Sequence, residues 1–155
     1  MRKSLIILGI LEDRDLEWLI ENGSGRRLQV GDCLLRQGRK VEAMYFLLAG
    51  RLGVELETPE AKQLAELESG EVVGEISLLD SRAATASVRA LDEALVLEIR
   101  HDELKAKLEA DVGFQARLYR SLGMFLAQRM RNTILTLSYG DDRTEEEEEE
   151  IDEIE

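Results

Sequence analysis

Residues 70–90 have the sequence GEVVGEISLLDSRAATASVRA, the most informative segment of the chain. Two glycines, Gly70 and Gly74, lead into a short segment of helical character, and the small residues Ala83 to Ala86 lead into a strand. The free amides at the start of such a helix, together with small side chains, let an anion approach the backbone. Glu75, at the helix start, is placed to accept a hydrogen bond from a sugar hydroxyl. The alternative is that Glu75 only complements the helix dipole.

Short strands surround this stretch over about residues 26–100. Apolar and polar side chains alternate there, as at Leu52, Val54 and Leu56 and again at Ala86, Val88 and Ala90. Glycines at positions 31, 38, 50, 53, 70 and 74 separate the runs. This pattern is typical of an antiparallel sandwich or barrel. We expect a mainly β fold with α, a jelly-roll-like antiparallel β-roll.

Helices are predicted on both sides of the β-roll. Residues 2–22 have helical spacing, with Asp13 as the N-cap and Asn22-Gly23 as a stop that uses a left-handed residue. After the roll, over about residues 102–138, Asp102 is expected to cap a short helix and Asp111 a long one that Gly140 stops. The chain is thus a β-roll flanked by short N-terminal helices and a long C-terminal helix.

The apolar stripe of the long helix covers about half of its circumference, more than the roughly 100° that packing on its own roll requires. Its members are Phe114, Leu118, Tyr119, Leu122, Phe125, Leu126, Met130, Ile134 and Leu137. The excess predicts an isologous homodimer, with Leu118, Leu122, Phe125, Leu126 and Met130 on the dimer helix. The alternative is that one large core takes the whole stripe.

Most of the net charge of −13 lies in the tail, residues 141–155, where eleven acidic residues face one arginine, a balance of −10. We expect one domain over residues 1–140 and an acidic disordered tail over 141–155. The tail either solubilises the protein or docks on a basic protein partner. The remaining 22 acidic and 19 basic residues leave the body at −3, so no basic cluster is present to bind nucleic acid.

Several function classes are disfavoured by what the sequence contains. No apolar run approaches the roughly 20 residues that cross a bilayer, so we expect a cytoplasmic protein without a membrane partner. The one cysteine, Cys33, and the one histidine, His101, offer no metal spacing, and a capping role suffices for His101. Ser77 and Thr85 have no partner that would activate them as nucleophiles. The protein is predicted not to be an enzyme.

The order of these segments resembles the cyclic-nucleotide-binding domain family, with a β-roll similar to that of catabolite activators. The segments that carry the resemblance are Leu8 to Glu12 through Trp18-Leu19, Val30-Gly31-Asp32 with Leu35 to Gly38, Met44 to Leu52, Gly74-Glu75, and the long helix. The resemblance covers about residues 5–138. Only 15 mostly acidic residues follow Gly140, so a single-domain member without a helix-turn-helix is expected.

The resemblance implies a site for cyclic AMP or cyclic GMP, although the residues themselves make no cofactor certain. Glu75 looks like the family's ribose-binding glutamate, Thr85 like the hydroxyl residue beside the phosphate, and Thr133 is similar to positions that face the base. The candidate ligand-binding residues are Gly74, Glu75, Ile76, Ser77, Arg82, Ala84, Thr85, Ala86 and Thr133.

One departure from the family pattern matters, because Ala84 stands where the resemblance implies a phosphate-binding arginine. Its loss removes on the order of 2 to 5 kcal/mol of charge-assisted binding. Arg82, two residues earlier, is a surface arginine or a substitute cation, and Arg89 lies further along the next strand. Two hypotheses follow: a sensor module for a cyclic nucleotide or another anionic ligand, or a ligand-free adaptor dimer that acts through protein contacts.

Overall fold

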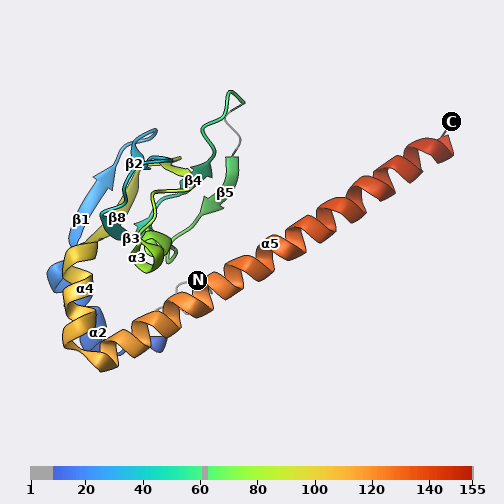
Figure 1. Ribbon diagram of the computed structural model, residues 1–155. Coiled ribbons are helices and arrows are strands. Elements are labelled where there is room, and N and C mark those ends of the chain that lie inside the picture. The colour runs from blue at the N-terminus through green and yellow to red at the C-terminus, as the bar shows by residue number, and fades with distance from the viewer. Residues whose placement is uncertain (1–8, 61–62, 155) are drawn as a thin grey trace.

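The computed structural model describes the backbone of residues 9–60 and 63–154, and the side chains of these residues as far as residue 138 (Figure 1). Helices expected before residue 9 lie outside the described residues. The elements in order are α2 (Asp13–Asn22), β1 (Ser24–Leu28), β2 (Cys33–Leu35), β3 (Ala43–Ala49), β4 (Leu52–Glu55), β5 (Gln63–Leu67), β6 (Val72–Val73), α3 (Glu75–Asp80), β7 (Ser87–Ala90), β8 (Ala94–Arg100), α4 (His101–Ala110) and α5 (Val112–Ile154). This order confirms the predicted fold class.

Two four-stranded sheets form the roll, in the strand orders β1-β8-β3-β6 and β2-β7-β4-β5. Every pairing is antiparallel. Strands β3 and β6 bring Tyr45 opposite Val73, so the residue after β6, Gly74, lies beside the start of β3. The topology thereby places β6 at the edge of the first sheet and β7 inside the second, with α3 between them in the chain (Figure 1).

The first sheet separates two hydrophobic cores. On strand β3, Tyr45 and Leu47 belong to the core inside the roll, whereas Met44 and Phe46 belong to a second core shared with the helices. This alternation follows from the period of two in a strand, and it explains why the run from Met44 to Leu47 is apolar throughout. The sheet is therefore covered on both faces.

The ends of α2 differ from the prediction. Glu12, not Asp13, is the N-cap, and it forms a capping box in which its own backbone N–H donates to Asp15 at 2.8 Å. The helix ends at Asn22 as expected, but Gly23 is extended, with φ −86°. Glycine is needed there for space, because a Cβ would lie 2.7 Å from the Leu19 carbonyl oxygen.

The caps of α4 and α5 are predicted correctly in one case and wrongly in the other. Asp111 caps α5, since its carboxylate accepts a hydrogen bond from the Phe114 N–H at 3.0 Å. Helix α4 begins at His101 with Arg100 as the N-cap, so Asp102 lies in the first turn and is not the cap. The predicted acid therefore lies two residues after the position that caps the helix.

Helix α5 continues past Gly140, where a stop was expected, and runs to Ile154. The predicted stop is wrong because a single glycine in a helix costs only about 1 kcal/mol relative to alanine. The backbone of residues 141–154 is helical, where a disordered tail was expected. Glutamate is a good helix former, and the helix already established upstream supplies the nucleus.

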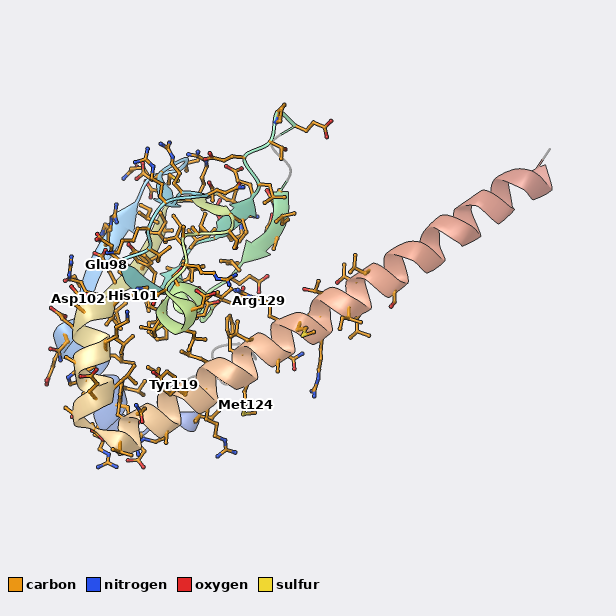
Figure 2. All side chains as sticks on the ribbon, in the orientation of Figure 1. Glu98, His101, Asp102, Tyr119, Met124 and Arg129 are labelled. Carbon is orange, nitrogen blue, oxygen red and sulfur yellow. The ribbon has the colours of Figure 1, made fainter. Side chains whose placement is uncertain are left out.

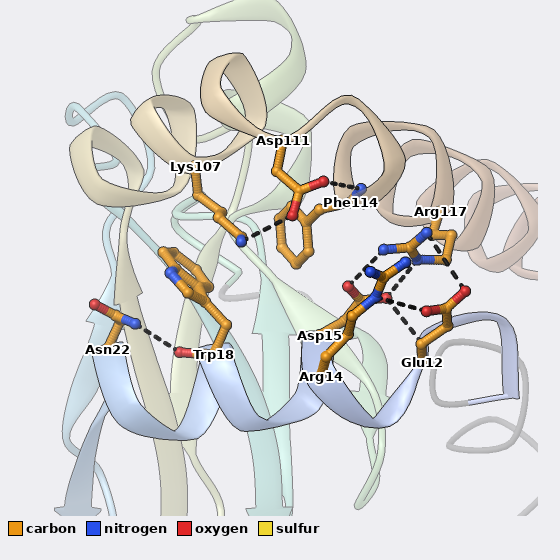
Figure 3. A network of polar contacts seen from close by, with 9 residues as sticks. All are labelled: Glu12, Arg14, Asp15, Trp18, Asn22, Lys107, Asp111, Phe114 and Arg117. Carbon is orange, nitrogen blue, oxygen red and sulfur yellow. Dashed lines mark hydrogen bonds and ion pairs between the residues drawn. The ribbon is translucent and has the colours of Figure 1, made fainter.

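A network of polar and aromatic contacts joins the start of α5 to α2 (Figure 3). The Arg117 guanidinium donates to both carboxylate oxygens of the buried Asp15, at 2.6 and 2.9 Å. This bidentate pair lowers the pKa of Asp15 below its ordinary value. Next to it, the Lys107 ammonium lies 5.7 Å from the centre of the Trp18 ring and 5.4 Å from that of Phe114.

The packing of α5 corrects the assignment of the dimer helix. Leu118, Leu122 and Phe125 are buried in the chain's own helical core, and Leu126 packs against it. Of the five residues assigned to a dimer surface, Met130 alone is largely exposed, at 66%. The stripe appeared wide in the sequence because it combines an inner face, used within the chain, with the exposed residues of the following turns.

Candidate functional site

The 70–90 stretch encloses a pocket of about 100 Å³ between α3 and the roll. Eight of the nine candidate residues line it, namely Gly74, Glu75, Ile76, Ser77, Arg82, Ala84, Thr85 and Ala86. The structure therefore brings together the residues that the sequence grouped. Glu75 and Ser77 form the buried side, whereas Ile76, Arg82 and Thr85 are exposed at the rim.

Gly74 sets the geometry of the pocket because it turns the chain from β6 into α3. Its φ of +85° is in the left-handed region, and a Cβ at this position would collide with the carbonyl oxygen of Ala43. The Gly74 carbonyl oxygen also lies 3.0 Å from Nε2 of His101. Burial is the main reason that the pKa of His101 is lowered. Because the Gly74 carbonyl oxygen can only accept, the Nε2–H of the ring is the donor in this contact. His101 thus supports the turn, where the sequence predicted a capping role.

Glu75 is the buried carboxyl of the site, with 2% of its surface exposed. Burial raises its pKa, and the charge of Arg129 acts in the opposite direction. Glu71, another buried carboxyl, accepts a hydrogen bond from the Glu68 N–H at 2.6 Å. Glu75 therefore lines this pocket, whereas Glu71 lines the neighbouring cavity between β5 and α5.

Arg129 is a site residue that the sequence reasoning missed. Its side chain extends from α5 toward α3 (Figure 2) and lines the pocket. Its guanidinium lies 3.3 Å from Glu75 Oε1 and 3.8 Å from Glu71 Oε1, and donates to the Val72 carbonyl at 3.4 Å. The same group stacks 4.6 Å from the centre of the Phe125 ring. The sequence did contain a signal for Arg129. It lies four residues after Phe125, and residues four apart lie on the same face of a helix, so Arg129 is on the face that Phe125 buries.

The position of Ala84 is fixed by the backbone. Its N–H donates to the Arg39 carbonyl at 2.9 Å, and its carbonyl accepts from the Gly38 N–H at 2.8 Å. Arg82 lines the pocket, and among the described residues its side chain has no ion-pair partner. Arg89 does not line the pocket and is paired with Glu55, whose carboxylate lies 2.6 Å from its guanidinium. Only Arg82 and Arg129 therefore bring positive charge to the described part of the pocket.

Thr133 lies away from the other candidates. It lines a second cavity, of about 590 Å³, between β5 and α5. Its hydroxyl donates to the Arg129 carbonyl of its own helix at 3.0 Å. Arg129 lines both cavities, so the two spaces adjoin at this side chain. A ligand that reached Glu75 and Thr133 together would have to pass Arg129.

The described residues offer neither a metal-binding cluster nor a membrane-spanning helix. No group of three or more His, Cys, Asp or Glu side chains in that part of the chain is arranged to hold a metal ion. None of the helices described is both long and apolar enough to cross a membrane.

Comparison with known proteins agrees with the geometry. The chain is 27% identical over 126 residues to an uncharacterized NTE family protein of Mycobacterium tuberculosis, which covers 81% of this chain and 21% of the relative. It is 27% identical over 109 residues to the cAMP-activated global transcriptional regulator CRP of Salmonella typhimurium, which covers 68% of this chain and 52% of the relative. The chain thus spans between a fifth and about half of the length of these relatives.

One solved structure and one family model are also similar to this chain. The crystal structure of a cyclic nucleotide-binding domain from Methylobacillus flagellatus superposes with a TM-score of 0.74 at 19% identity, covering 84% of this chain and 80% of that one. At this identity the similarity establishes the fold. The sequence model described as "Cyclic nucleotide-binding domain" matches residues 25–111, more than half of the chain. The chain belongs to the cyclic nucleotide-binding domain family.

Proposed function

We propose that this chain is a non-enzymatic regulatory module that senses a cyclic nucleotide, cyclic AMP or cyclic GMP, through the pocket at the 70–90 stretch. The observation that carries the proposal is the placement of Glu75. Its carboxyl is 2% exposed, lies at the start of α3 on the wall of a pocket, and is paired with Arg129 at 3.3 Å. A carboxylate oxygen in this place can also accept a hydrogen bond from a ribose hydroxyl that enters the pocket.

The rest of the pocket favours weak binding. Ala84 carries no charge, and the rim arginine, Arg82, is exposed, where ion pairs contribute only about 0 to 1 kcal/mol. Thr85 and the small side chains of Ala84 and Ala86 leave room for a phosphate beside the backbone. We therefore expect a dissociation constant for cyclic AMP well above that of a site with a buried arginine.

A second candidate function is a homodimeric adaptor that acts through α5 on an unidentified protein partner. It is favoured by the exposed apolar side chains of the second half of the described helix. Met130, Ile134, Leu135 and Leu137 are each more than half exposed. A two-fold pairing of this part of the helix would cover them. Sedimentation of the full chain decides this point, since the proposal requires a dimer that Leu137→Glu disrupts.

Calorimetric titration and thermal melting with cyclic AMP and with cyclic GMP test the sensor function. A ligand present at one hundred times its dissociation constant stabilises the fold by about 2.7 kcal/mol. Glu75→Gln should abolish any shift in melting temperature. Glu109→Gln is the matched control because Glu109 is exposed on α4, away from the pocket. If neither nucleotide shifts melting of the wild type or of Ala84→Arg, the sensor function is wrong and the adaptor function stands.

A further inference from the structure

An open groove of about 360 Å³ lies on the roll, where the chain passes from β2 to β3, and three cations line it. These are Arg36, Arg39 and Lys40, and their side chains are exposed. Glu42 is the one acid of the lining, so the groove has a net charge of +2. Since residues 1–140 have a balance of −3, the groove is a positive site on a weakly negative body.

Acids of the same chain hold the cations of the groove only weakly. The Arg36 guanidinium lies 3.9 Å from the Glu57 carboxylate, at the limit of an ion pair. The Lys40 ammonium lies 4.0 Å from the Glu42 carboxylate, and both side chains are exposed. Within the described part of the chain, the Arg39 side chain has no ion-pair or hydrogen-bond partner. The positive charge of the groove is therefore available to a carboxylate from outside.

The loop that carries these cations has a fixed backbone. The Gly38 N–H donates to the Ala84 carbonyl at 2.8 Å, and the Arg39 carbonyl accepts from the Ala84 N–H at 2.9 Å. The Gln37 N–H donates to the hydroxyl of the buried Ser87 at 3.0 Å. A partner that bound in the groove would therefore order side chains but not the loop, which lowers the entropic cost of binding.

The chain itself contains a segment of complementary charge. Residues 145–150 are consecutive glutamates, and the tail, residues 141–155, has a balance of −10. Because every residue of this run is a glutamate, it offers carboxylates to a cationic surface in whatever conformation it binds. Arginine and carboxylate form charge-assisted contacts that are often bidentate, and a lysine adds a third donor. The run therefore matches the groove in charge and in hydrogen-bonding groups.

Helix α5 carries the tail away from the groove of its own chain. The helix is continuous from Val112 to Ile154, and Phe125 is its last described buried side chain. At about 1.5 Å per residue, Glu147 lies about 33 Å beyond Phe125 along the helix. Figure 1 shows the C-terminal end of α5 directed away from β2 and β3. The groove is thus accessible to the tail of another copy.

We propose that the groove lined by Arg36, Arg39 and Lys40 binds the glutamate run 145–150 of a second copy of this chain. The contact joins two different surfaces, so it closes into a pair only if each tail reaches the groove of the other copy. Exposed ion pairs are individually weak and are screened by salt, so the contact is weak and strengthens at low ionic strength. The proposal rests neither on a ligand in the 70–90 pocket nor on pairing of α5.

Carbodiimide crosslinking of the full chain tests this contact. The reagent joins a lysine amine to a carboxylate that is in direct contact with it, and Lys40 is the one lysine of the groove. After digestion with trypsin, the expected product joins residues 40–51 to residues 144–155. In an equal mixture of unlabelled and nitrogen-15-labelled protein, this product should include pairs of one labelled and one unlabelled peptide, because the contact joins two copies.

Two changes should lower the yield of the product at least about 5-fold, because exposed ion pairs depend on charge and on screening. One is the double substitution Arg36→Gln with Arg39→Gln. The other is an increase in NaCl from about 0.1 M to about 1 M, over which the Debye length falls from about 10 to about 3 Å. Arg120→Gln with Arg131→Gln is the matched control, because it removes the same charge from exposed positions outside the groove.

An ion pair within the chain serves as the internal standard of the reaction. The Lys107 ammonium lies 2.9 Å from Asp111, so this pair should crosslink without mixing of isotopes. If it does so while Lys40 gives no tail product, the proposal is overturned. The same follows if the exposed Lys105, outside the groove, gives as much tail product as Lys40. A Lys40 product without mixed isotope pairs would overturn the assignment to a second copy.

Discussion

Restoring a cation at position 84 should create a tighter nucleotide site. The Cβ of Ala84 lines the pocket, and its backbone is held by two hydrogen bonds, at 2.9 and 2.8 Å, to the loop at residues 38–39. An arginine introduced by Ala84→Arg would therefore start from a fixed point, and its guanidinium could reach a phosphate beside the small residues that follow. Because residue 84 is only half-buried, the longer side chain has an exit to solvent in the absence of ligand.

The expected gain follows from the kind of contact formed. A hydrogen bond to a charged group contributes about 1.5 to 3 kcal/mol. Affinity for cyclic AMP should therefore rise about 10- to 150-fold. The free energy of unfolding without ligand should change by less than about 0.5 kcal/mol, since no buried group is disturbed.

Isothermal titration calorimetry with cyclic AMP at pH 7 measures this effect. Ala84→Gln is the matched control because it adds a long polar side chain without charge. The reasoning is refuted if Ala84→Arg and Ala84→Gln bind equally, since the pocket would then not place a phosphate within reach of residue 84.

The remaining predictions concern stability. Arg117→Met should lower the free energy of unfolding at pH 7 by about 3 to 5 kcal/mol in urea denaturation, because it leaves the 2% exposed Asp15 without its cation. The folded-state pKa of Asp15 is depressed, so this contribution is present above about pH 4 and is lost as the pH falls further; a pH-independent difference would contradict it. Gly74→Ala should cost about 2 kcal/mol or more, from its left-handed φ and the collision with Ala43. Gly38→Ala, with a similar φ of +81° but open space, should cost only about 1 kcal/mol, and equal melting temperatures would refute the steric part.

The fold and the location of the pocket could be predicted because both depend on local patterns. Alternating strands, glycine turns and helical spacing are visible in a single sequence, and eight of the nine candidate residues lie in one short segment. The Asp111 cap was predictable for the same reason, since its partner is the Phe114 N–H three residues away.

The parts that could not be predicted depend on contacts between distant segments. Arg129 meets Glu75 across 54 positions, and no local pattern marks that pairing. The partner of the apolar stripe on α5 could not be predicted either. Periodicity indicates which residues are apolar, but not whether the chain's own core or a second chain covers them. The role of His101 was missed because it depends on the turn at Gly74.

The contact between His101 and Gly74 also offers a spectroscopic opportunity. The chain contains a single histidine, so its imidazole gives one set of ring resonances, free of overlap with other histidines. The ring contacts the turn at Gly74 that leads into α3, and its Nε2–H donates to the Gly74 carbonyl. In nitrogen-15-enriched protein, the shifts of this imidazole would therefore register any rearrangement of the turn in solution, without a substitution or an attached probe.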